Sequence, residues 1–204
     1  MALKTHTIIQ FSTLDQLIFH DERPDWLQTE LPAQQFAVVR RMEVTDIVPI
    51  GIRGSNRSQR CAAFINRTAI VNTIPCTDLV AKIAVFQNYW YYPYLQKLQE
   101  SLSEHEWGIT GSIGFEIATG MNVTTEQSDI DISIYVDEMN WGILANIYEK
   151  IQRIYPRIDV QIEVAQVGCV LLNDFIRNYA QGFLVRTTKG PLLCKLVDEK
   201  LQLA

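Results

Sequence analysis

Two aspartates, Asp129 and Asp131, stand one residue apart where a segment of alternating apolar and polar residues begins, at positions 130 to 136. On a β-strand, residues i and i+2 point to the same face, with their Cα atoms roughly 6.5 to 7 Å apart. Two carboxylates this close repel each other and destabilise the fold unless a cation neutralises them. Mg²⁺ suits such a pair, because it binds hard oxygen ligands and fills its other positions with water and substrate phosphates. The pair therefore predicts a magnesium site.

A third acid begins the next alternating segment, at positions 158 to 165. There Asp159, Gln161 and Glu163 share one face, and apolar residues form the other. If this strand runs beside the first, Asp159 is level with the aspartate pair, so we expect it to complete the site, with Glu163 as the reserve. In a two-metal site the ions activate an attacking oxygen and stabilise a leaving phosphate.

Gly111 and Ser112 precede the acids and predict a turn that binds phosphate. A turn that exposes backbone N–H groups and a hydroxyl can hold a pyrophosphate. Each feature alone has an ordinary explanation, since most D-x-D sequences lie in solvated loops and Gly-Ser pairs are common in turns. Together they are typical of phosphoryl or nucleotidyl transfer.

The N-terminal half has a concentration of arginines, five within 21 positions: Arg40, Arg41, Arg53, Arg57 and Arg60. Guanidinium groups match the geometry of phosphates, so Arg53 and Arg57 are candidates for substrate binding. A solvated surface with scattered ion pairs explains the same residues equally well.

The elements that position these residues are predicted from hydrophobic period and turn chemistry. Strands are expected at 35–41 and 47–53, then 130–136 and 158–165, with a closing hairpin of 182–186 and 192–196. Helices are expected from Thr77 or Asp78 to Leu98 with a bend near Pro93, and at 140–155 and 171–180. Interleaved strands and helices indicate an α+β protein, which we divide into residues 1–80 and 81–204.

Composition bounds the class of protein. The chain has 204 residues, 48% of them apolar, which excludes a disordered protein. A net charge of −5 gives no broad footprint for nucleic acid, and no apolar run reaches the roughly 20 residues that a membrane span needs. Four cysteines without CxxC spacing suggest idle thiols in a reducing compartment. We therefore expect a cytoplasmic protein with neither nucleic acid nor membrane as partner.

The Gly-Ser turn followed by an acid pair resembles the signature of the nucleotidyltransferase superfamily typified by DNA polymerase beta. One departure is the spacing, because 16 residues separate Ser112 from Asp129. This longer form, WGITGSIGFEIATG…SDIDISI, is similar to the malonate decarboxylase holo-[acyl-carrier-protein] synthase family, also called phosphoribosyl-dephospho-CoA transferase. Further similarity lies in VPIGIRGSNRSQRCAAF, IDVQIEV and FLVRTTKGPLL.

The resemblance implies a polymerase-beta-like nucleotidyltransferase core preceded by a smaller α/β N-terminal unit. It implies that the phosphoribosyl-dephospho-CoA group of 2'-(5''-triphosphoribosyl)-3'-dephospho-CoA is transferred to a serine of the acyl-carrier-protein subunit of malonate decarboxylase, with release of pyrophosphate. In this interpretation Asp129, Asp131 and Asp159 hold Mg²⁺, and Gly111 and Ser112 bind the triphosphate. The resemblance also favours the substrate-binding role for the two candidate arginines.

Three alternatives remain at this point. The chain could be another small nucleotidyltransferase that modifies a protein or RNA, or the related citrate lyase holo-acyl-carrier-protein synthase. From another class, it could be a binding module that kept the fold and lost catalysis. Intact acids at all three positions speak against the last alternative, because a binding role has no need of three metal-placing carboxylates.

Overall fold

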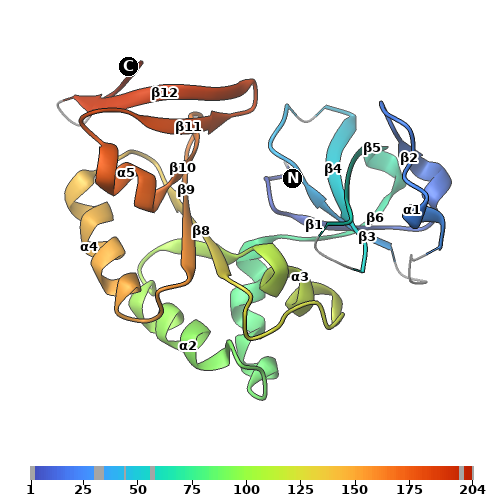
Figure 1. The fold of residues 1–204 in the computed structure, drawn as a ribbon, viewed down its shortest axis with the longest axis horizontal. Helices are drawn as coiled ribbons and strands as arrows, with labels where there is room; N and C mark the ends of the chain where they lie inside the picture. The colour runs from blue at the N-terminus through green and yellow to red at the C-terminus, as the bar shows by residue number, and fades with distance from the viewer. Residues whose placement is uncertain (1–2, 30–34, 44, 56–57, 198–199, 204) are drawn as a thin grey trace. The chain divides into compact units, whose positions relative to one another are not determined.

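The computed structural model describes residues 3–29, 35–43, 45–55, 58–197 and 200–203. The chain divides into two compact units between Pro75 and Cys76 (Figure 1). The sequence had suggested a division between residues 80 and 81. Each unit has its own sheet and is described separately.

The first unit is built on a six-stranded sheet in the order β2-β5-β4-β3-β1-β6, in which all pairs of described strands are antiparallel. Its strands are β1 (Ile8–Phe11), β2 (Leu17–Ile18), β3 (Gln35–Val39), β4 (Ile47–Arg53), β5 (Arg60–Asn66) and β6 (Ile70–Ile74). The strands predicted at 35–41 and 47–53 are thus confirmed as β3 and β4.

The expectation of an α/β architecture for this unit was wrong. Its one described α-helix is the short α1 (Trp26–Thr29), and 3-10 turns lie at 14–16 and 67–69. Antiparallel neighbours can be joined by short turns, whereas parallel strands need a crossover of a dozen or more residues. β4 and β5, which follow each other in the chain, pair in antiparallel register, so no crossover helix is needed between them.

The second unit contains a seven-stranded sheet in the order β13-β12-β11-β10-β9-β8-β7. Its strands are β7 (Glu106–Ile109), β8 (Ile130–Val136), β9 (Ile158–Val164), β10 (Gly168–Leu171), β11 (Phe183–Thr187), β12 (Gly190–Val197) and β13 (Lys200–Leu203). Its helices are the 3-10 segment η3 (Cys76–Phe86), α2 (Tyr92–Ser101), α3 (Gly111–Thr119), α4 (Trp141–Gln152) and α5 (Leu172–Asn178). Strands and helices alternate as predicted, which confirms an α+β protein with a mixed sheet.

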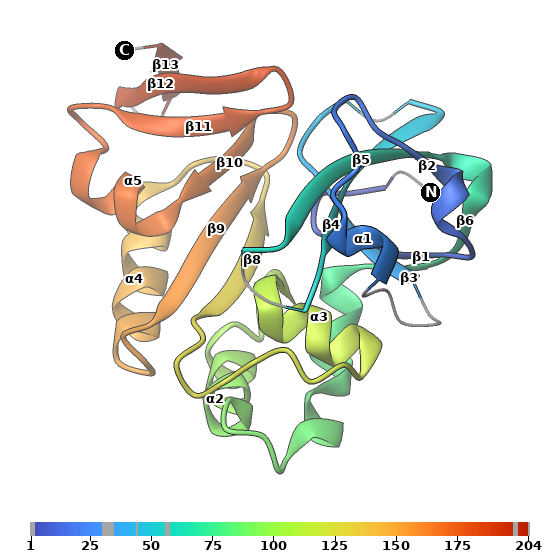
Figure 2. The ribbon, with the colours of Figure 1, turned by 45° about the vertical axis from the view of Figure 1, so that its right-hand side comes forward.

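Strands β8 and β9 are parallel and run side by side, connected by α4 (Figure 2). Both strands alternate as the sequence predicted: Ile130, Ile132 and Ile134 are fully buried on one face, and acids lie on the other. Helix α5 packs on β9 and on α4, covering the apolar face. The opposite face carries the polar side chains, and α3 packs against β8.

The long helix predicted from residue 77 to 98 is divided in two. Cys76–Phe86 is a 3-10 helix, and α2 begins only at Tyr92, with Pro93 in its first turn. Proline lacks an N–H and is favoured in that first turn, so it starts a helix here instead of bending one. The helix predicted at 140–155 is confirmed as α4, whose first turn is capped by the Asn140 side chain accepting from the Ile143 N–H at 3.0 Å.

The C-terminal part holds two strands that the sequence did not reveal, β10 and β13, on either side of the predicted hairpin of β11 and β12. The predicted helix 171–180 is confirmed as α5. Among the described helices, none is both long and apolar enough to cross a membrane.

Candidate functional site

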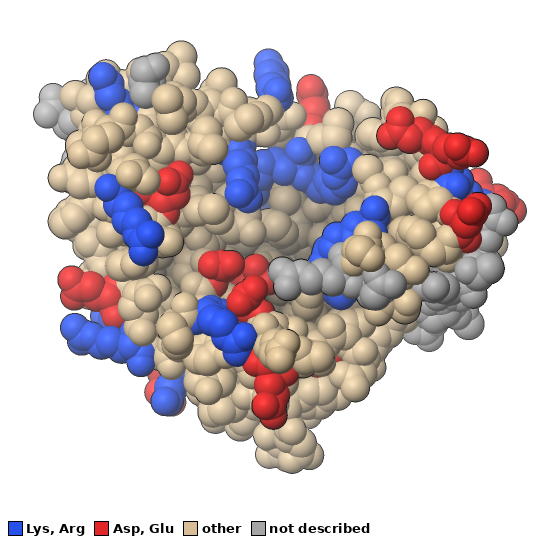
Figure 3. All heavy atoms as spheres, in the orientation of Figure 1, with Lys and Arg blue, Asp and Glu red and all other residues tan. Residues whose placement is uncertain are grey.

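The three predicted acids lie at or next to the start of the parallel strands β8 and β9. The register places Asp131 directly beside Asp159, and the Ile130 N–H donates to the Arg157 carbonyl at 2.9 Å. Neighbouring strands lie about 4.8 Å apart, so the two carboxylates stand side by side on one face. Asp129 precedes β8 by one residue. Figure 3 shows acidic side chains at the surface of the second unit where β8 begins.

The reserve acid lies away from this group. Glu163 is the register partner of Tyr135, near the far end of β9. Four residues of strand separate it from Asp159, which corresponds to about 13 Å. The geometry therefore favours Asp159 as the third acid.

Gly111 is pressed against the Asp131 carboxylate. A Cβ at Gly111 would lie 1.9 Å from Asp131 Oδ2, and the residue has a φ of +62°, which side chains other than glycine rarely adopt. The neighbouring Thr110 N–H donates to the Asp131 carbonyl at 2.9 Å. The Gly-Ser pair is thus fixed beside the acids, and a glycine is required there for two separate reasons.

Gly111 and Ser112 form the first turn of helix α3, whereas the sequence predicted only a turn. The first N–H groups of a helix have no intrahelical acceptor. The feature that the prediction relied on, exposed backbone donors next to a hydroxyl, is therefore provided by a helix start. Such a start favours negatively charged groups such as phosphates.

Two hydroxyls beside the acids were not foreseen. Thr110 Oγ1 and Ser133 Oγ are both buried, and neither has a hydrogen-bond partner among the described residues. Ser133 follows Asp131 by two positions on the same face of β8. Most buried polar atoms are paired, so two unpaired hydroxyls in one region indicate a place for a ligand or water. In the sequence, the only signals were that Ser133 follows Asp131 by two positions and that Thr110 precedes Gly111.

The donor set fits magnesium in its chemistry. Carboxylate oxygens from Asp129, Asp131 and Asp159 are hard ligands, and Mg²⁺ is usually held by one or two carboxylates together with water and phosphate. Over the described ranges, no three His, Cys, Asp or Glu side chains converge as a complete ligand set.

A tyrosine on the acid face contributes no charge. The Tyr135 hydroxyl lies 3.2 Å from the Cys76 thiol. Burial, and then the neighbouring Cys76, raises the pKa of Tyr135 well above its ordinary value. The phenol therefore stays protonated at neutral pH, and the carboxylates remain the charged groups on this face.

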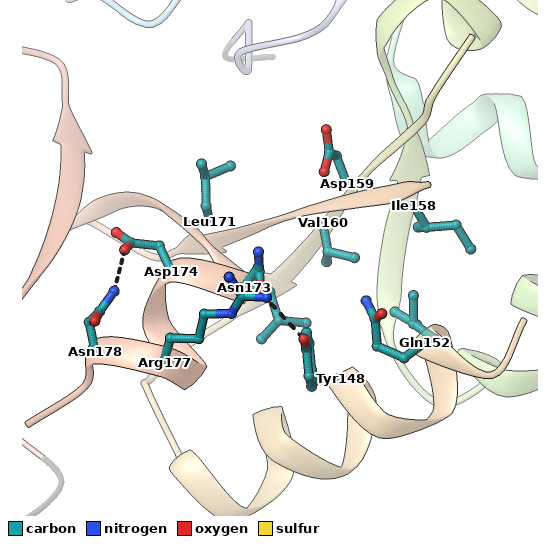
Figure 4. Close-up of a pocket in the computed structure, with 12 residues that line it drawn as sticks. Tyr148, Gln152, Ile158, Asp159, Val160, Leu171, Asn173, Asp174, Arg177 and Asn178 are labelled. Atoms are coloured by element: carbon teal, nitrogen blue, oxygen red, sulfur yellow. Dashed lines mark hydrogen bonds between the residues drawn. The ribbon is translucent and has the colours of Figure 1, made fainter. Parts of the chain in front are cut away.

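A pocket of about 250 Å³ lies on the other face of the sheet, between α4, α5 and the strands (Figure 4). Four of its polar side chains form two hydrogen bonds: Tyr148 donates to Asn173 at 3.3 Å, and Asn178 donates to Asp174 at 2.8 Å. Figure 4 shows Asp159 pointing to the side of β9 opposite Val160. Asp159 therefore adjoins both places, because the residue lines the pocket while its side chain points away from Val160.

The predicted arginines belong to the first unit. Arg53 ends β4, and its register partner in β5 is Arg60. Arg57 lies outside the described residues. The hairpin thus brings two guanidinium-bearing residues to one end of the sheet.

Comparison with known proteins gives matches along nearly the whole chain. Residues 79–196 match the model of the phosphoribosyl-dephospho-CoA transferase MdcG C-terminal domain, and residues 4–76 match that of the MdcG N-terminal domain. No solved structure matches the chain.

Three similar relatives carry the name phosphoribosyl-dephospho-CoA transferase. The protein of Pseudomonas syringae pv. tomato is 30% identical over 191 residues, which is 90% of this chain and 87% of the relative. That of Azotobacter vinelandii is 30% identical over 169 residues, 79% of each chain. That of Klebsiella pneumoniae is 28% identical over 175 residues, 82% of this chain and 83% of the relative.

Proposed function

Because this chain belongs to the phosphoribosyl-dephospho-CoA transferase MdcG family, we propose that it loads the carrier-protein subunit of malonate decarboxylase with its prosthetic group. Membership makes the chain a transferase. The donor is then 2'-(5''-triphosphoribosyl)-3'-dephospho-CoA, and the acceptor is a serine of the apo carrier protein.

The observation that carries this proposal is the register of β8 and β9, which pairs Asp131 with Asp159 beside the Gly111 backbone. Two adjacent carboxylates next to a helix start suit a reaction in which a metal-bound polyphosphate is attacked. The same arrangement supports a polymerase-beta-like nucleotidyltransferase core for the second unit.

The reaction is a displacement at phosphorus. The serine oxygen of the carrier forms a bond to the α-phosphorus of the triphosphate, and the bond from that phosphorus to the bridging oxygen of the β-phosphate breaks. Pyrophosphate leaves with the electron pair, and the serine gives up its proton. The products are a phosphodiester on the carrier and free pyrophosphate.

The chain's own residues have distinct roles in this proposal. Asp129 and Asp131 hold the cation, and Asp159 helps to hold it or accepts the proton of the serine hydroxyl. Gly111 and Ser112 bind the triphosphate through N–H and hydroxyl groups. Mg²⁺, when bound, neutralises the developing charge on the phosphate oxygens.

Arg53 and Arg57 are proposed to bind phosphates of the dephospho-CoA group. Guanidinium groups form paired hydrogen bonds with phosphate oxygens. Their place in a family-specific N-terminal domain supports a role in recognising the donor.

The proposal is tested by the mass of the carrier. The chain is incubated with apo carrier protein, Mg²⁺ and triphosphoribosyl-dephospho-CoA, and intact-protein mass spectrometry should show the added phosphoribosyl-dephospho-CoA group. A carrier with alanine at the acceptor serine is the control and should keep its mass. A carrier that stays unmodified with this donor contradicts the proposal.

The same assay separates the alternatives. Labelling with ATP or CTP as donor in place of the CoA derivative indicates another nucleotidyltransferase. Faster labelling of the citrate lyase carrier than of the malonate decarboxylase carrier indicates the citrate lyase synthase.

Asp159 and Glu163 form a matched pair for mutation on one strand. Asp159→Asn should lower the transfer rate about 100-fold or more, the usual range for loss of a general base. Glu163→Gln, about 13 Å further along the strand, should change it by no more than about twofold, since substitutions away from a site have small effects. Initial rates from the carrier mass assay measure both. The reverse order of effects would make Glu163 the third acid.

A further inference from the structure

Glu116, in helix α3, is a buried carboxylate with no role in the reaction described above. Its side chain is 1% exposed. Isolated charges are expensive to bury, and buried acids are therefore paired or hydrogen-bonded. The question is which groups this carboxylate holds in place.

Each carboxylate oxygen of Glu116 accepts two hydrogen bonds. Oε2 accepts from the backbone N–H groups of Val123 and Thr124, at 2.6 and 2.9 Å. Oε1 accepts from the hydroxyls of Thr124 and Tyr91, at 2.9 and 3.1 Å. Burial, and then the charge of Glu116, raises the pKa of Tyr91, so its hydroxyl remains a donor. Three of these four donors belong to the segment that connects α3 to the aspartates.

The remainder of that segment is also tied down. The Ser128 N–H donates to the Thr125 carbonyl at 2.8 Å, closing a turn. The Arg157 side chain donates to the carbonyls of Gln127 and Glu126 at 2.8 and 2.6 Å. Since the Arg157 carbonyl also accepts from the first residue of β8, hydrogen bonds anchor the chain from residue 123 into that strand.

We infer that Glu116 is a positioning residue, which clamps residues 123 and 124 and so sets where Asp129 and Asp131 enter the site. The inference rests on the proposed roles of the two aspartates. Glu116 touches neither reacting group, and it acts through the segment it holds. Carboxylates that accept backbone N–H groups form the stronger class of hydrogen bond, which suits a clamp.

Two substitutions of Glu116 test the clamp. Glutamine can accept both backbone N–H groups through its carbonyl oxygen while its NH₂ donates to the two hydroxyls, so Glu116→Gln should preserve the clamp. Glu116→Leu leaves both N–H groups without an acceptor. In Glu116→Leu, the Val123 and Thr124 amides should exchange with deuterium about tenfold faster or more, the loss expected for charge-assisted bonds. Unchanged exchange in Glu116→Leu would overturn the inference.

Transfer kinetics distinguish positioning from stability alone. We expect Glu116→Leu to reduce transfer about 100-fold, the cost of a misplacement of about 1 Å, and to raise the Mg²⁺ concentration for half-maximal rate. Glu116→Gln should retain most of the parent rate, because the amide can keep the hydrogen bonds to the segment and the charge of Glu116 takes no part in the transfer reaction. A fall in rate with the parent Mg²⁺ dependence would indicate a loss of folded protein and would overturn the inference.

Tyr91→Phe and Thr124→Val form a control pair that disturbs the core less. Each removes one hydroxyl donor to Glu116 Oε1, but only Thr124 belongs to the clamped segment. Thr124→Val should speed exchange in residues 120–128 more than Tyr91→Phe does; equal effects would contradict the clamp.

An Asp131 variant separates this inference from the proposed function. Parent kinetics in Glu116→Leu, together with an inactive Asp131→Asn, would refute only the clamp. Full activity in Asp131→Asn would refute the proposed site itself, and with it the basis of the clamp.

Discussion

Replacing Asp131 by asparagine is expected to reduce transfer to the carrier protein by about 1,000-fold or more. The substitution keeps the shape of the side chain and removes the charge that would hold the cation. Loss of several kcal/mol of charge stabilisation in the transition state corresponds to a factor of this size. The rate is measured by carrier mass under saturating donor and Mg²⁺.

Although Asp131→Asn should lose activity, its folded state should be as stable as that of the parent or slightly more stable. Asp131 and Asp159 are register partners, and like charges directly opposite each other destabilise a sheet. Without Mg²⁺, Asp131→Asn should therefore unfold at the same temperature as the parent or a higher one, with a gain of at most about 1 kcal/mol. For the activity, an Asp131→Asn variant that transfers at more than a tenth of the parent rate would contradict the assignment of Asp131 to the site.

Replacing Gly111 by alanine should have the second largest effect, because it affects both activity and stability. The new Cβ would lie 1.9 Å from Asp131 Oδ2, so the carboxylate or the start of α3 must shift. A displacement of about 1 Å at a reacting centre can cost about 100-fold in rate. Because alanine is strained at this positive φ, the substitution should also lower the free energy of unfolding by about 1 to 2 kcal/mol.

Gly120 is the matched control for that strain. It has a φ of +73°, and a Cβ there would meet nothing within 4 Å. Gly120→Ala should therefore lose similar stability in thermal or denaturant unfolding and keep most of its transfer activity. Equal loss of activity in the two alanine variants would show that strain alone, without contact to Asp131, explains the effect.

Local pattern was enough to predict the two strands that carry the acids. Alternation of apolar and polar residues predicts both β8 and β9, and the position of Asp159 near the start of its strand predicts the third acid. The sequence did not predict that the two strands are neighbours in the sheet, because strand order depends on contacts between residues that are distant in the chain. The intervening helix α4 made a parallel pair plausible, since such strands need a crossover.

Helix α3 was missed because its sequence is a poor helix former. It carries Gly111 and Gly114, and glycine costs about 1 kcal/mol relative to alanine in a helix. Its stability comes from packing, with Ile113, Phe115 and Ile117 all buried. That packing is invisible without the fold, and so is the buried carboxylate of Glu116.

Short elements were missed for a different reason. Strands β7, β10 and β13 have four residues each, too few for a period of two to stand out. The first of these positions Thr110 beside Asp131, so a part of the candidate site could not be predicted. The arginines illustrate the same limit, because clustering in sequence does not indicate what a side chain binds.

The parallel register of β8 and β9 also has a consequence for how the protein folds. In the unfolded chain, Asp131 and Asp159 are separate solvated carboxylates, and their repulsion arises only when the crossover through α4 closes. Closing a long connection is a slow class of folding event. If the pair forms in the folding transition state, removing one charge speeds folding, and if it forms later, removing it slows unfolding. The folding and unfolding rates of a variant that lacks one carboxylate therefore report whether β8 and β9 pair before or after the folding transition state.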